Sequence, residues 1–107
     1  MSPEDFGLEK YINFNNANSH EIEKYILNCE KIECSPNQID IMTSNYIITI
    51  HYFAGRYICN IYDRTCYEGM IIKTSSIERF NIIGINSFHQ LLERLYYTLS
   101  RLNRSEG

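Results

Sequence analysis

Residues 45–63, NYIITIHYFAGRYICNIYD, decide the fold of this chain. β-branched and aromatic residues fill both halves of the stretch, and Ala54 and Gly55 separate them, which predicts an antiparallel hairpin. A loop of two or of four residues at this point gives the same register. One face of the hairpin is then wholly apolar and consists of Ile48, Ile50, Tyr52, Tyr57, Cys59 and Ile61. The other face is mixed and consists of Ile47, Thr49, His51, Phe53, Arg56, Ile58, Asn60 and Tyr62.

The apolar face is predicted to lie under a C-terminal helix, which fixes the register because a slip of one residue would exchange the two faces. The mixed face is less polar than a simple water-facing surface. Three occupants are open for it: the N-terminal helices, which would make a three-layer fold, a protein partner, including a second copy of this chain, or a single-stranded nucleic acid. In the last case the contacts would come from aromatic and basic side chains, namely His51, Phe53, Arg56, Tyr62 and Arg64.

The C-terminal part of the chain predicts a long amphipathic helix. Ser87 and Gln90, three positions later, form a capping box. Apolar residues then recur at helical spacing in one stripe, which must pack on the sheet. The stripe consists of Phe88, Leu91, Leu92, Leu95, Tyr96, Leu99 and Leu102.

Two helices are predicted near the N-terminus. Ser2 and Pro3 start the first, since serine can cap a helix and proline suits its first position. Asn18 and Glu21 form a capping box for the second. The region of this helix ends at residues 35–37, Ser-Pro-Asn, because proline cannot continue a helix. Its apolar stripe consists of Ile22, Tyr25, Ile26 and Cys29.

Strand-like segments separated by short turns lie between these helices. They are residues 38–42, 46–53, 56–62, 67–73 and 77–83. Connections this short make neighbouring strands antiparallel. The sequence therefore predicts one α+β domain, residues 1–107, with N-terminal helices, an antiparallel β-meander of about five strands, and a long C-terminal amphipathic helix packed on the sheet.

The charges are distributed unevenly along the chain. The net charge is −3 overall, −5 through residue 45 and +2 from residue 46 onward. Such an asymmetry indicates a charged partner. The overall acidity argues against a general nucleic-acid-binding protein.

No apolar run approaches the roughly 18–20 residues that span a bilayer, and the acidic N-terminus differs from a secretory signal. We therefore expect a cytoplasmic protein without membrane contact. Its cysteines would be reduced there, and none forms a C-x-x-C pair, so buried packing is favoured over a zinc site. The cysteines are Cys29, Cys34, Cys59 and Cys66.

No residue pattern predicts catalysis. His51 lies between apolar neighbours, and the glycines are isolated rather than grouped in a phosphate-binding loop. Asp40, Asp63 and Glu68 could meet around a metal, as in a nuclease, but no spacing requires it. We therefore expect a binding protein rather than an enzyme, with no catalytic residue, no metal site and no cofactor.

The meander followed by GINSFHQLLERLYYTLSRL, residues 84–102, resembles two groups of proteins. One comprises the single-stranded-DNA-binding Whirly and coactivator-type folds, in which strands precede a packing helix. The other comprises immunity proteins of contact-dependent inhibition and related polymorphic-toxin loci, which are small, cytoplasmic, often acidic, and in some cases similar to Whirly folds. The resemblance covers residues 38–102 and lies in layout rather than in motifs, so no site residue follows from it.

The leading hypothesis is an immunity or antitoxin-like protein that binds and neutralises a cognate toxin of the nuclease type. An acidic surface can occupy a basic substrate cleft and speed association with it. The residues predicted to bind the toxin are Glu21, Glu23, Glu30, Glu33 and Asp40. Two alternatives stay open: a single-stranded nucleic-acid-binding module that uses the mixed face, and a phage-type protein inhibitor of a host factor.

Overall fold

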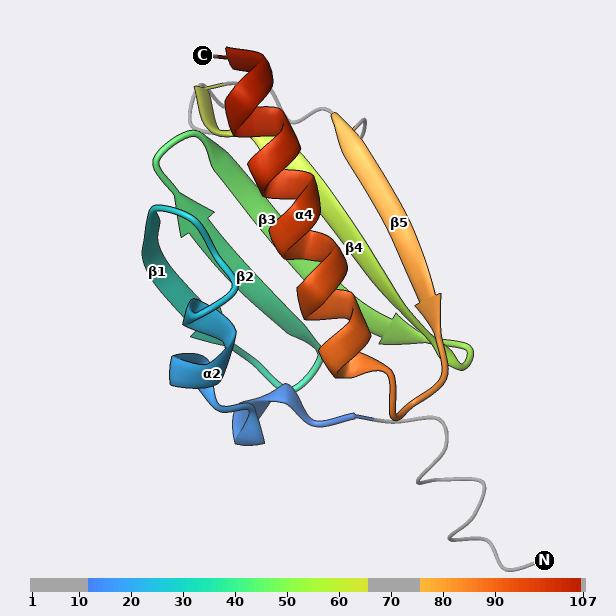
Figure 1. Cartoon of the computed structure of the whole chain (residues 1–107). Coiled ribbons are helices and arrows are strands. Elements are labelled where there is room, and N and C mark those ends of the chain that lie inside the picture. The colour runs from blue at the N-terminus through green and yellow to red at the C-terminus, as the bar shows by residue number, and fades with distance from the viewer. Residues whose placement is uncertain (1–11, 66–75, 107) are drawn as a thin grey trace, which may run out of the picture.

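The computed structural model describes residues 12–65 and 76–106. The strands in these ranges are β1 (Cys29–Cys34), β2 (Gln38–Thr43), β3 (Tyr46–Phe53), β4 (Arg56–Asp63) and β5 (Glu78–Ile83). The helices are the 3-10 helix η1 (Phe14–Asn16), α2 (Ser19–Glu23) and α4 (Phe88–Glu106). The five described strands form one antiparallel sheet in chain order, and α4 crosses one face of it (Figure 1). The predicted α+β fold, with a meander and a C-terminal helix packed on it, is confirmed.

The hairpin of β3 and β4 has the predicted register, in which Ile48 pairs with Ile61. Ala54 and Gly55 form the turn, with φ angles of 53° and 80°. Positive φ at both central residues is the type I′ geometry, whose twist matches that of the two strands. The two-residue loop is therefore the one that the chain adopts.

The core lies between the sheet and α4. The sheet side contributes fully buried residues that include Ile48, Ile50, Cys59 and Ile61. The helix contributes Leu91, Leu92, Leu95 and Leu99. These are residues predicted to face one another, although Tyr96 of the predicted stripe is 40% exposed. Burying each large side chain contributes about 1.5–3 kcal/mol before conformational entropy is charged against it.

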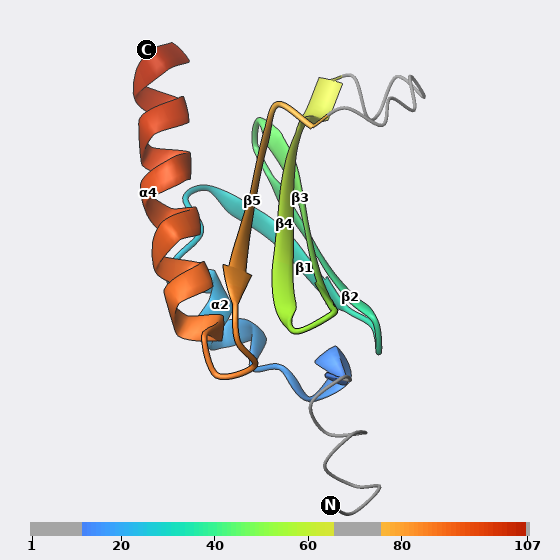
Figure 2. The same ribbon diagram turned by 90° about the vertical axis from the view of Figure 1, so that its right-hand side faces the viewer.

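The short helix α2 lies on the same face of the sheet as α4, so the three-layer arrangement is wrong for the described helices (Figures 1 and 2). Its residues Ile22 and Ile26 join the same core cluster as the leucines of α4. Both helices lie on this face because the sheet is wider than one helix. A helix with its side chains is about 10–12 Å across, whereas five strands spaced about 4.8 Å apart span roughly 19 Å. One helix cannot cover this face, and α2 covers part of the remainder.

The second predicted helix is also shorter than expected. It ends at Glu23, and Cys29 begins strand β1 instead of completing a helical stripe. Asn28 has a φ of 57°, a left-handed conformation that asparagine tolerates and that leads the chain into β1. Residues 35–37 join β1 to β2 as a turn, in which the Ser35 N–H donates to the Gln38 carbonyl at 2.9 Å. Proline thus separates two strands here.

The predicted helix starts are partly confirmed. Asn18 caps α2, because its side-chain oxygen accepts hydrogen bonds from the N–H groups of His20 at 3.0 Å and Glu21 at 3.3 Å. Ser87 directly precedes α4, and its carbonyl accepts from the N–H of Leu91 at 3.0 Å. The predicted first helix and the predicted strand at 67–73 lie largely outside the described residues.

The second face of the sheet points away from both helices (Figure 2). We call it the open face, because no described helix lies on it. By strand register, its side chains are Lys31, Glu33, Gln38, Asp40, Met42, Ile47, Thr49, His51, Phe53, Arg56, Ile58, Asn60, Tyr62, Arg79, Asn81 and Ile83.

Candidate functional surfaces

The structure separates the five acidic residues predicted to bind a toxin. Glu21 and Glu23 lie on α2, and Glu30 lies on β1. Glu33 and Asp40 lie on the open face, where they are paired in the register of β1 and β2. We call Glu21, Glu23 and Glu30 the acidic margin, since they border the edge strand β1 and the helix beside it.

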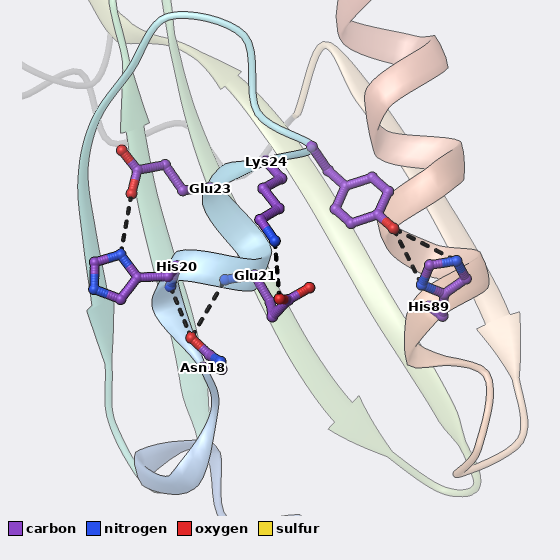
Figure 3. Close-up of polar contacts among 7 residues, drawn as sticks. Asn18, His20, Glu21, Glu23, Lys24 and His89 are labelled. Atoms are coloured by element: carbon purple, nitrogen blue, oxygen red, sulfur yellow. Dashed lines mark hydrogen bonds and ion pairs between the residues drawn. The ribbon is translucent and has the colours of Figure 1, made fainter.

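Two carboxylates of the acidic margin make exposed contacts with basic side chains within α2 and its C-cap (Figure 3). Glu21 Oε1 lies 3.1 Å from Lys24 Nζ, and Glu23 Oε2 lies 4.0 Å from His20 Nδ1. Each glutamate side chain is more than half exposed in these pairs. Exposed pairs of this kind contribute only about 0–1 kcal/mol, so both carboxylates remain available to another cation.

Glu23 and Glu30 flank a shallow depression of about 140 Å³ at the outer margin of β1. Cys29 lies in it, half-buried. Burial raises the pKa of the Cys29 thiol, and the negative charges of Glu23 and, to a smaller extent, Glu30 raise it further. The thiol is therefore held in its neutral, weakly nucleophilic form. Lys31 also lines the depression, which therefore presents two carboxylates and one ammonium group rather than a reactive cysteine site.

Four of the five residues predicted to contact nucleic acid share the open face: His51, Phe53, Arg56 and Tyr62. Arg64 does not join them. Its Nη1 donates to Glu30 Oε1 at 2.8 Å and to the Thr43 carbonyl at 2.8 Å, and its side chain is only 23% exposed. Arg64 is therefore part of the scaffold beside β1 and β2.

A cavity of about 410 Å³, which was not predicted from the sequence, lies between η1, α2 and the first turns of α4. Phe14, Ile22 and Phe88 make its apolar wall. On one side, the Tyr25 hydroxyl lies 3.3 Å from His89 Nδ1, and the two rings meet edge to face (Figure 3). The capping boxes predict where α2 and α4 begin, and both helix starts border this cavity. The sequence pattern does not show that the two helix starts lie close together in space.

Within residues 12–65 and 76–106, the possible metal ligands are dispersed and the Cys59 thiol is inaccessible. No group of three or more His, Cys, Asp or Glu side chains converges there on one point. Cys59 is fully buried, and burial raises the pKa of its thiol far above the usual range, although Arg94 opposes the effect. Among the same residues, no helix combines the length and apolar character that crossing a membrane requires.

No family model, curated protein or solved structure matches this chain.

Proposed function

We propose that this protein is an immunity protein, which binds a cognate protein toxin of the nuclease type and blocks it through the acidic margin. The observation that supports this proposal is the position of the net charge. Residues 19–43, which contain α2, β1 and β2, hold five acidic and two basic residues, a net charge of −3. The whole chain also carries −3, so the rest of the chain is neutral overall.

A nuclease must hold phosphates with lysine and arginine side chains, so its cleft is basic. A compact acidic surface can enter such a cleft, and opposite fields speed the encounter. Glu30 is well suited to this role, because the bond from Arg64 holds its carboxylate in one position while leaving the side chain 48% exposed. Binding to a fixed carboxylate loses less side-chain entropy than binding to a mobile one.

The test starts with capture. The tagged chain is used as bait in its native cell, and the captured polypeptide is then expressed alone and together with this chain. We expect the polypeptide to arrest growth and degrade nucleic acid when alone, and this chain to relieve both effects. A captured host protein that is not toxic would instead support an inhibitor of a host factor, and would contradict the immunity proposal.

A matched pair of charge reversals tests the surface. Glu23 and Glu93 each form an exposed pair with a histidine, at 4.0 and 3.7 Å, and their side chains are 58% and 53% exposed. Glu23→Lys should weaken binding of the purified toxin about tenfold, equivalent to about 1.4 kcal/mol, whereas Glu93→Lys on α4 should not. Equal affinities for the two variants would show that the acidic margin is not the binding surface.

One observation favours a second candidate, a single-stranded nucleic-acid-binding module. His51, Phe53, Arg56 and Tyr62 share the open face, and aromatic rings beside cations are the elements of such sites. This candidate predicts that a fluorescent oligothymidine binds at low salt and is released steeply as salt rises. Absence of salt-sensitive binding at low ionic strength would eliminate it.

A further inference from the structure

The open face has an exposed apolar patch at one end. Phe53 is 69% exposed and Ile83 is 83% exposed. Both are register neighbours of Arg56, so the three side chains stand side by side on β3, β4 and β5. Large apolar side chains that gather on one surface commonly mark a contact with another molecule.

Three of the five charged side chains of the open face lie along one line, while Lys31, which pairs with Glu33 at 2.6 Å, and Arg56 lie off it. Register pairs Glu33 with Asp40, then Thr49, Asn60 and Arg79, so that one row crosses all five described strands. We call these residues the charged row. It is acidic at β1 and β2, neutral at β3 and β4, and basic at β5. Arg79 has no ion pair with another residue in the described part of the chain.

We propose that the open face binds a second copy of this chain, related by a two-fold axis that lies between the two sheets and runs along β3. Such an axis places β1 of one copy over β5 of the other and keeps each row over itself. Glu33 of one copy then faces Arg79 of the other, and the same contact occurs twice, as two-fold symmetry requires. The two Phe53 side chains meet at the axis.

The charged row also disfavours the other orientation. An axis between the sheets but perpendicular to the strands would place β1 over β1 and β2 over β2, so that Glu33 and Asp40 would face the same carboxylates of the partner copy instead of Arg79, with Lys31 as the cation on that edge. Like charges in a closing interface are repulsive. Sheets that pack face to face are about 10 Å apart and keep their strands within about 30° of each other, which is compatible with the axis along β3.

This inference does not depend on the proposed toxin, because the acidic margin borders α2 and the outer side of β1. It does compete with nucleic-acid binding, because both would occupy the open face. The open face carries three basic and two acidic side chains, and the two carboxylates lie together on β1 and β2. A polyanion that crossed the sheet along the charged row would meet Glu33 and Asp40, whereas a second copy places Arg79 opposite Glu33.

The first test is the mass of the purified full-length chain by light scattering and analytical ultracentrifugation. We expect a dimer that dissociates on dilution. Phe53→Glu should raise the dissociation constant at least tenfold, whereas Tyr97→Glu should not, since Tyr97 is equally exposed, at 69%, but lies on α4. A wild-type monomer at high micromolar concentration, or a dimer that resists Phe53→Glu, would overturn the proposal.

A charge exchange tests the axis itself. Glu33→Arg and Arg79→Glu should each weaken the dimer at least tenfold, because each places like charges opposite one another. The double variant restores opposite charges and should dimerise within about threefold of wild type, a difference of less than 1 kcal/mol. If the loss of dimerisation free energy in the double variant equals the sum of the losses in the two single variants, the two residues do not face one another and the axis is wrong.

Discussion

Arg64 joins the edge strand β1 to the strand beside it, because its Nη1 contacts both Glu30 Oε1 and the Thr43 carbonyl at 2.8 Å. The Arg64 side chain is 23% exposed, so solvent screens these bonds less than it would on an open surface. The contact gives Arg64 a structural role, in place of the phosphate contact that the sequence suggested. It also orients Glu30 within the acidic margin.

Replacing Arg64 with alanine should lower the free energy of unfolding by about 1–3 kcal/mol, because the Thr43 carbonyl and Glu30 lose a charged donor. Arg101 provides the matched control. It also donates to a glutamate, Glu78, at 2.8 Å, but its side chain is 54% exposed. Arg101→Ala should lower stability by only about 0–1 kcal/mol. Urea denaturation of both variants checks this, and equal losses would contradict the role given to Arg64.

Replacing Ala54 with a residue that favours a positive φ should stabilise the protein. Its φ of 53° lies in the left-handed region, which costs a residue with a Cβ about 1–2 kcal/mol. Ala54→Asn should stabilise the protein by about 1 kcal/mol, because Asn-Gly is favoured in type I′ turns. Ala54→Val should destabilise it, since branched residues fit this region poorly. Thermal unfolding measures both changes, and a stability order with valine above asparagine would refute the assigned turn.

The sheet side of the core should be intolerant of cavities. Ile48 is fully buried in the hairpin beneath α4, so Ile48→Ala should lower the free energy of unfolding by about 2–5 kcal/mol. Tyr97→Ala on the exposed side of α4 should change it by less than about 0.5 kcal/mol. Denaturant unfolding at one fixed protein concentration compares the two. Similar losses at both positions would mean that the face under α4 is misassigned.

Tyr57 should make stability fall in alkaline solution. Its hydroxyl donates to the Ile85 carbonyl at 2.7 Å, and burial, with a smaller effect of Tyr52, raises its pKa from 10.0 to about 12. The unfolded chain loses this proton above about pH 10, while the folded chain keeps it. The contribution of Tyr57 is therefore complete below pH 10 and is lost as pH rises to about 12.

The variant Tyr57→Phe isolates this effect. It should be less stable than wild type by about 0.5–1.5 kcal/mol at pH 8, because the Ile85 carbonyl loses its donor. The difference should narrow between pH 10 and pH 12, where wild type loses the contribution of its tyrosine proton. Urea denaturation at a series of pH values measures it. A difference that stays constant across this range would contradict the raised pKa.

The sequence predicted the centre of the fold because two independent patterns agreed there. The hairpin of β3 and β4 has one apolar face, and the helix after Ser87 has one apolar stripe, so each requires the other. The region before Pro36 was harder. Ile22, Tyr25, Ile26 and Cys29 fit a helical stripe, but the left-handed Asn28 and pairing of β1 with β2 override that local preference.

The candidate surfaces could be predicted only in part. Alternation along β3 and β4 placed His51 and Phe53 on one face, because strand periodicity is local. The acidic residues could not be grouped in this way. Glu23 and Glu33 are ten positions apart, yet the turn at Asn28 and the register of β1 against β2 place them on different sides of the sheet. Such separations depend on tertiary packing rather than on spacing.

The central claim is tested most directly by measuring whether this chain restores the growth of cells that express the captured toxin. Cells that express the captured toxin are given wild-type chain, the triple variant Glu21→Lys, Glu23→Lys and Glu30→Lys, or Phe53→Glu. Wild type and Phe53→Glu should both restore growth, because the acidic margin is intact in each, and the triple variant should not. If the triple variant, folded and expressed at the same level, restores growth as well as wild type, the acidic margin does not neutralise the toxin.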